Sequence, residues 1–148
     1  MKKERRTFIM DVATALLCVI LTAGVRIVFH ACDAKEDGTW MTCHWAEMTV
    51  FAAGIAMTLQ ALILCLVRGK GCHGIRAGLC LAIAVQSILC ALVPGAVIRL
   101  CMMESMRCHT VMRPAVLLTG LLLAVLSVIC GLRHRAMCGR GHLSSDAQ

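Results

Sequence analysis

The stretch VMRPAVLLTGLLLAVLSVICGL, residues Val111–Leu132, is apolar along almost its whole length. Arg113, near its start, is its one charged residue. A helix of about 20 residues is long enough to cross the hydrocarbon core of a bilayer, which is about 30 Å thick. The stretch therefore predicts a membrane-spanning helix.

Three similar runs lie upstream, at about 8–29, 48–67 and 75–98. The 148-residue chain is 59% hydrophobic and 16% charged, whereas a soluble domain is close to half apolar and a quarter charged. Four spans leave no room for a soluble catalytic domain. We expect an all-α fold, a four-helix transmembrane bundle that forms one integral membrane domain over residues 1–148.

The first run has a second interpretation, as a secretory signal, because MKKERR precedes an apolar stretch that ends in LTAG. Asp11 inside the run and the lack of a clean A-x-A cleavage site argue against it. We therefore count this run as a retained span.

Basic residues predict the orientation, because cytoplasmic loops of membrane proteins are enriched in lysine and arginine. Ten of the fifteen lie in three segments, MKKERR, RGKGCHGIR and RHRAMCGRGH. The other five lie near the remaining two loops, where five acidic residues match them. The excess of +7 thus falls on one side. We predict a multi-pass protein of the plasma membrane with both termini cytoplasmic. Its expected partner is the lipid bilayer rather than nucleic acid, because only 3% of residues are aromatic.

The two loops predicted to lie outside carry the same tetrapeptide, Met-x-Cys-His, at Met41–His44 and at Met106–His109. A further cysteine follows each motif's cysteine by 22 residues, and an arginine follows by 25; these are Cys65 and Arg68 in the first copy and Cys130 and Arg133 in the second. Such spacing indicates a duplication into two tandem helical hairpins, at about 8–70 and 75–135. Both units run in the same direction, which is the parallel-repeat arrangement of some transporters.

The outer cysteines favour disulfides, because paired thiols tend to oxidise outside the cytoplasm. The candidates are Cys32, Cys43, Cys101 and Cys108. Pairing within each loop is the simplest arrangement, and pairing across the loops is the alternative.

The same motifs are also candidate metal ligands. Thiolate and thioether groups favour copper(I), and imidazole accepts copper or zinc. The candidate ligand set is Met41, Cys43, His44, Met106, Cys108 and His109. Glu47, three residues after His44, could orient that ligand or belong to an interfacial polar patch.

A third interpretation is enzymatic. Four spans with two cysteines in each outer loop resemble the quinone-linked enzymes that generate disulfides in the bacterial envelope. Those enzymes need a reactive thiolate, often in a Cys-x-x-Cys motif, and this chain has no such motif. We therefore favour a non-enzymatic role, with a membrane thiol-disulfide oxidoreductase as the alternative.

Other polar and small residues give weaker signals. Asp11, the one acid within a span, is expected to pair with a lysine or arginine. Cysteines inside spans are expected to act as small hydrophobic residues; these are Cys18, Cys65, Cys80, Cys90 and Cys130. An inner metal site is conceivable at Cys72, His73, His134, Cys138 and His142. Close helix approach is expected at Gly54, Gly78, Gly95 and Gly120.

The order of these features resembles an uncharacterised family of small four-span bacterial and archaeal membrane proteins. That family has a cysteine followed by Met-x-Cys-His in the first outer loop and again before the last span. The matching residues are Cys32, Met41, Cys43, His44 and Trp45, then Cys101, Met106, Cys108, His109 and Pro114. Members are often encoded beside ATP-binding-cassette permeases of the macrolide-exporter type. The resemblance thus implies an accessory, assembly or sensory subunit of a transporter.

Overall fold

A computed structural model describes residues 2–31, 38–67, 72–100 and 106–145. Within these ranges the chain is almost entirely helical. The elements are α1 (Lys2–Ile27), α2 (Thr42–Leu66), α3 (His73–Leu92), the π-helical turn η1 (Cys108–Met112) and α4 (Arg113–Ser145).

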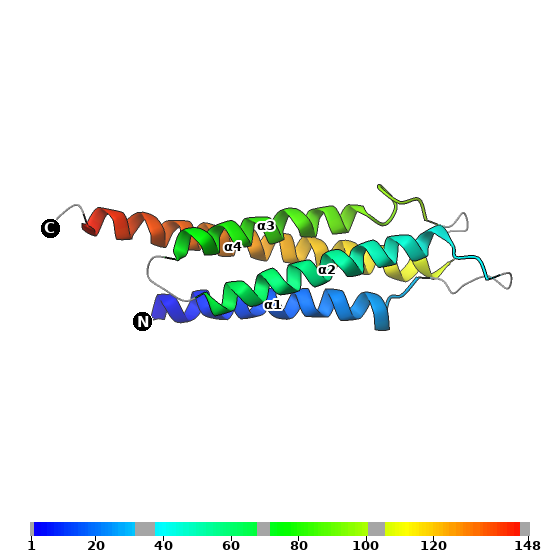
Figure 1. Cartoon of the computed structure of the whole chain (residues 1–148), viewed down its shortest axis with the longest axis horizontal. Helices are drawn as coiled ribbons and strands as arrows, with labels where there is room; N and C mark the ends of the chain where they lie inside the picture. The colour runs from blue at the N-terminus through cyan, green and yellow to red at the C-terminus, as the bar shows by residue number, and fades with distance from the viewer. Residues whose placement is uncertain (1, 32–37, 68–71, 101–105, 146–148) are drawn as a thin grey trace.

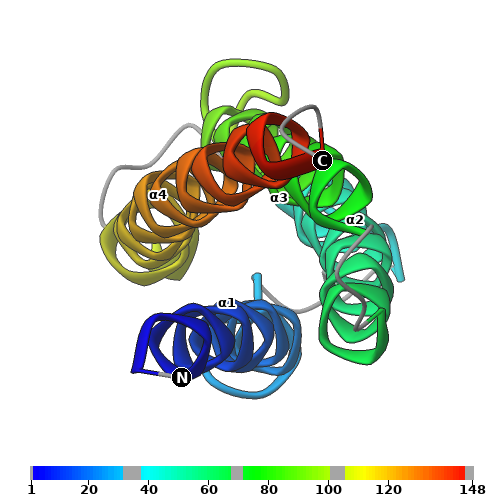
Figure 2. The ribbon, with the colours of Figure 1, turned by 90° about the vertical axis from the view of Figure 1, so that its left-hand side faces the viewer.

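The four helices run side by side along one long axis (Figure 1). Seen end-on, they follow one another around the bundle in chain order (Figure 2), and contacts join α1 to α2, α2 to α3, α3 to α4 and α4 to α1. Helix α1 begins and α4 ends at the same end of the bundle, which we call the termini end. The opposite end, where both Met-x-Cys-His motifs lie, is the loop end.

The surface of the bundle is apolar, as expected of helices that face lipid. Large aliphatic side chains are exposed along all four helices, such as Leu16 at 58% and Leu118 at 66%. The interior is also mainly apolar, with Leu21, Met57 and Leu123 fully buried, and it holds a few small polar side chains, among them Thr14, Ser87 and Ser127. Within the described residues, four segments are long and apolar enough to cross a membrane: Arg5–Ile27, Thr42–Leu66, His73–Leu92 and Cys108–Cys138. The predicted all-α four-helix fold is confirmed.

Helix α3 ends at Leu92, although its apolar run was expected to continue to residue 98. Pro94 has no amide hydrogen to continue the helix. Gly95 follows with a φ of +102°, a left-handed conformation that glycine adopts without strain. The apolar run of the sequence extends beyond the end of the helix, because the residues after Gly95 are still apolar.

Two of the four glycines expected at helix contacts do lie there. A Cβ added at Gly120 would meet the carbonyl oxygen of Ser87 at 2.9 Å and the Cβ of Ala91 at 3.0 Å. One added at Gly54 would meet the hydroxyl of Thr22 at 2.6 Å. Gly78 has open space around it, and Gly95 serves the turn, so the expectation was wrong for these two.

Replacing Gly120 with alanine is expected to lower the free energy of unfolding by about 1–3 kcal/mol, because the added methyl must push apart two backbones. Thermal unfolding of the detergent-solubilised protein measures the loss. The matched control is Gly78→Ala, which fills open space on a helix and should be neutral or stabilising by up to about 1 kcal/mol. Equal losses in both variants would contradict the close approach of α3 and α4.

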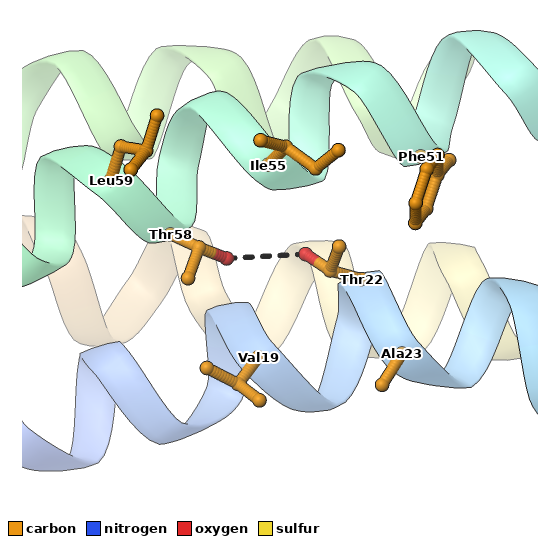
Figure 3. Close-up of a pocket in the computed structure, with 7 residues that line it drawn as sticks. All are labelled: Val19, Thr22, Ala23, Phe51, Ile55, Thr58 and Leu59. Atoms are coloured by element: carbon orange, nitrogen blue, oxygen red, sulfur yellow. Dashed lines mark hydrogen bonds between the residues drawn. The ribbon is translucent and has the colours of Figure 1, made fainter.

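Helices α1 and α2 meet through a polar contact beneath a lipid-facing groove. The hydroxyls of Thr22 and Thr58 lie 3.2 Å apart across the interface (Figure 3). The groove encloses about 320 Å³ and is lined by Val19, Thr22, Ala23, Phe51, Ile55, Thr58 and Leu59. Lipid is as apolar as the helix surfaces, so the hydrophobic effect does not drive membrane helices together. Interhelical hydroxyl contacts of this kind contribute to their association instead.

Candidate functional site

The first Met-x-Cys-His motif starts α2. Met41 precedes the helix in extended conformation, and Cys43 points into the core with no exposed surface. The ring of His44 stacks on Trp40, with centroids 4.0 Å apart, and meets Trp45 edge-on at 5.9 Å. Both tryptophans are more than half exposed, which fits an aromatic belt at a membrane surface.

Glu47 ties the end of α1 to the start of α2. One carboxylate oxygen accepts a hydrogen bond from Arg26 at 3.0 Å, and the other accepts from the Ala31 amide at 2.7 Å. Its side chain is 6% exposed, whereas that of Arg26 is 44% exposed. Of the two roles considered for Glu47, this pairing supports a local structural one at the loop end.

The second motif has a different backbone, because Cys108 and His109 lie in the π-helical turn η1. Pro114 explains it: proline donates no amide hydrogen, and its ring crowds the carbonyl four residues earlier. The wider turn instead lets the Arg113 amide donate to the carbonyl of Cys108. Cys108 is fully buried, as Cys43 is.

Both motifs contribute to one buried cluster. It contains Cys43 and Cys108, and Met41 and Met106 pack against it. The proposed loop partners, Cys32 and Cys101, lie outside the described residues, as does Arg68 of the repeat. The disulfides and the duplication therefore stay predictions. The six candidate ligands of the outer metal set all lie within the described residues, and metal binding by them also stays a prediction.

A different group of ligand-type side chains converges near the termini end. Helix α1 contributes Asp11, α3 contributes Cys80, and α4 contributes Cys130 and His134. All four are buried, and one ligand atom from each lies within 4.8 Å of the others. In the described part of the chain, this is the one group of three or more histidine, cysteine and acidic residues close enough to share a metal ion. We call it the inner cluster.

Asp11 is the centre of the inner cluster. Its Oδ1 accepts a hydrogen bond from the Cys130 thiol at 2.9 Å and lies 3.1 Å from Nε2 of His134. Its Oδ2 accepts from the guanidinium of Arg76. The carboxylate thus has one oxygen toward a cation and one toward cluster ligands, and its expected pairing with a basic residue is confirmed.

Helical spacing and a glycine bring the cluster together. Arg76 and Cys80 are four residues apart on α3, as are Cys130 and His134 on α4, and such pairs share a helix face. A Cβ at Gly131 would lie 3.3 Å from the Cβ of Cys80. The missing side chain therefore lets α3 approach α4 closely enough for both cysteines to meet Asp11.

Some buried polar atoms of the cluster and its surroundings have no hydrogen-bond partner. Among the described residues, Nδ1 of His134 and Nε of Arg76 are buried without a protein hydrogen-bond partner. The half-buried His73, in the first turn of α3, stacks on His134 with ring centroids 5.9 Å apart. A second imidazole thus connects the cluster with the surface.

This geometry changes the interpretation of two cysteines. Cys80 and Cys130 were expected to be small hydrophobic residues, but they lie beside a carboxylate and an imidazole. The inner metal site considered as an alternative from the sequence included Cys138 and His142. Cys138 is exposed, and the side chain of His142 is outside the described part. His134 alone of that set joins the cluster, and sequence reasoning missed Asp11, Cys80 and Cys130 as its companions.

One carboxylate, two thiols and one imidazole around one point match a known coordination preference. Zinc is held tetrahedrally by cysteine sulfur at about 2.3 Å, histidine nitrogen at about 2.0–2.1 Å and carboxylate oxygen at about 2.0–2.2 Å. Ligand atoms in such a shell are roughly 3.3–3.8 Å apart. Oδ1 of Asp11 lies 2.9 Å from the Cys130 sulfur and 3.1 Å from Nε2 of His134, somewhat closer than two ligands of one ion, and the four ligand atoms lie within 4.8 Å of one another. The donor types therefore fit zinc.

The fold and the apolar surface define the class: the chain is a small four-span integral membrane protein. A family model described as "Domain of unknown function (DUF4418)" matches residues 14–132. The chain therefore belongs to the DUF4418 family, in agreement with the resemblance to an uncharacterised four-span family. No curated protein and no solved structure matches the chain.

Proposed function

We propose that this protein is a non-enzymatic membrane subunit whose inner cluster binds a transition metal, zinc by its donor set. The observation that carries the proposal is the convergence of Asp11, Cys80, Cys130 and His134 from three helices, all buried and within 4.8 Å. Buried ionisable groups inside a membrane bundle are costly and are usually kept for a function.

Charge balance supports a divalent ion in particular. The two positive charges of zinc and the one of Arg76 equal the negative charges of two thiolates and the Asp11 carboxylate. With protonated thiols and no metal, the Arg76–Asp11 pair is also neutral. Neither state leaves a net charge in the low-dielectric interior, where an unpaired charge is expensive.

Metal binding at this place would act on the whole bundle. The cluster joins α1 of the first hairpin to α3 and α4 of the second, so an ion bound there would hold the two hairpins together. A ligand that prefers one arrangement shifts the population toward it. This coupling supports the predicted accessory or sensory role. The transporter partner, an ATP-binding-cassette permease, is a proposal that rests on the family resemblance alone.

The proposed setting follows from the basic residues. With both termini in the cytoplasm of a plasma membrane, the termini end faces a reducing compartment that keeps thiols available as ligands. The outer Cys/Met/His centre, disulfide-stapled or copper- or zinc-binding, is a separate proposal. That proposal is supported by the burial of Cys43 and Cys108 in one cluster, against which Met41 and Met106 pack.

Elemental analysis of the purified full chain tests the assignment. We expect about one zinc per chain, since one four-ligand site is complete. The double variant C80S/C130S should lose it, because serine is a poor zinc ligand. The matched control C18S/C90S changes two other buried cysteines and should keep it.

A second pair of variants separates the two proposed centres. H44A/H109A removes both motif histidines, and the inner cluster should then hold its zinc unchanged. Metal lost from H44A/H109A but kept in C80S/C130S would assign it to the loop end and overturn the inner site. Protein that takes up no zinc while Cys80 and Cys130 are reduced would overturn it as well.

A further inference from the structure

A separate hollow lies between α1 and α4 on the surface of the bundle. It encloses about 310 Å³ and is lined by Arg6, Thr7, Arg133, Ala136 and Met137. Arg133 directly precedes His134 in sequence, but its side chain is exposed whereas His134 is fully buried. The hollow and the inner cluster are therefore on different faces of α4.

The two arginines in this hollow lack an acidic partner in the described part of the chain. The ion pairs found there involve Arg26 with Glu47, and Asp11 with Arg76 and His134. Arg133 donates instead to the thioether of Met10 at 3.0 Å, and sulfur is a weak acceptor. Both guanidinium groups thus keep most of their donors available for an anion.

The helix end adds to the positive field. Arg6 belongs to MKKERR in the first turns of α1, where the helix dipole is already positive and basic residues are unfavourable. Arg133 brings a further charge from α4. An anion between them would relieve both repulsions, and planar guanidinium groups match the geometry of phosphate oxygens.

Apolar side chains continue from the hollow toward the middle of the bundle. Ile9, three residues along α1 from Arg6, is 56% exposed. Ile129, four residues back along α4 from Arg133, is 41% exposed. Residues at these spacings share a helix face. A molecule with a phosphate head group and apolar tails could therefore contact the basic hollow and the neighbouring apolar side chains at the same time.

We propose that the hollow is a binding site for an anionic phospholipid, with its phosphodiester between Arg6 and Arg133 and its acyl chains along Ile9 and Ile129. Basic pockets between membrane helices commonly hold lipid head groups. The site is independent of the proposed metal, because it shares no side chain with the inner cluster.

Native mass spectrometry of the detergent-solubilised full chain tests the site. Phosphatidylglycerol should be retained in preference to phosphatidylcholine. The variant R6Q/R133Q should lose that retention by roughly thirtyfold, from the contribution of two cations near a head group. R5Q/R135Q removes the same charge from two exposed arginines outside the hollow and should stay within about twofold of the parent.

A charge-preserving variant and a free-phosphate control distinguish lipid binding from misfolding and from binding of phosphate alone. R6K/R133K preserves charge and should keep most binding even if R6Q/R133Q fails to fold. Inorganic phosphate, added alone, should not raise the melting temperature as phosphatidylglycerol does; an equal rise would make this a site for free phosphate and overturn the lipid. Equal losses in R6Q/R133Q and R5Q/R135Q would also overturn it, since they indicate only general surface charge.

Discussion

Replacing Asp11 with asparagine is expected to lower the free energy of unfolding by about 3–5 kcal/mol, the usual cost of breaking a buried ion pair. Asparagine keeps the size of the side chain but removes its charge. The guanidinium of Arg76, 11% exposed, would then lie buried without its counter-charge. Unfolding in mixed micelles with increasing denaturing detergent measures the loss, at a pH where the carboxylate is charged.

A double variant shows whether the loss comes from the pair. D11N/R76M removes both charges, and replacing a buried ion pair with apolar or neutral groups is often neutral. We therefore expect it to be more stable than D11N alone. R76M alone should be destabilised as well, because it leaves the carboxylate unpaired. Additive losses in the double variant would mean that Asp11 acts through Cys130 and His134 and not through Arg76.

The four spans could be predicted because hydropathy depends on composition over about 20 residues, and composition is visible in one sequence. The end of α3 could not be placed by the same signal. The chain leaves the helix at Pro94 and Gly95 through backbone geometry, while the residues beyond remain apolar. Hydropathy reports where a segment prefers lipid, and it does not report where the helix ends.

The inner cluster was partly visible in the sequence. Cys130-x3-His134 and Arg76-x3-Cys80 both have the four-residue spacing that puts two side chains on one helix face. The first is the spacing by which a helix presents two metal ligands. What the sequence lacked was the rotation of each helix about its axis. That rotation depends on close contacts such as Gly131 against Cys80. The proximity of these side chains to Asp11 could therefore be recognised only in the three-dimensional structure.

The repeated motif shows that matching short sequences can adopt different backbone conformations. The tetrapeptides match in sequence, yet the first begins a regular α-helix and the second a π-helical turn. The difference arises from Pro114, six residues after Cys108. Both cysteines are buried despite it. Identical spacing therefore did not predict an identical backbone for the two copies.

Zinc is expected to stabilise the protein against unfolding by about 2.7–4.1 kcal/mol when its free concentration is 100 to 1,000 times the dissociation constant. The effect should depend strongly on pH. Binding requires two thiolates from Cys80 and Cys130, so each zinc displaces up to two protons. Protons therefore compete with the metal. At a fixed zinc concentration, the melting temperature should rise between about pH 6 and pH 8, because the apparent affinity gains up to about a hundredfold per pH unit.

Two variants assign that pH dependence to the inner cluster. C80S/C130S has no thiols to deprotonate there, so zinc should add little stability at any pH across the same range. H44A/H109A keeps both thiols and should follow the parent protein, since its altered histidines lie at the loop end. Metal-free samples of all three provide the baseline against which the zinc effect is measured. A zinc effect that is independent of pH, or that persists undiminished in C80S/C130S, would mean that the ion is bound by other residues.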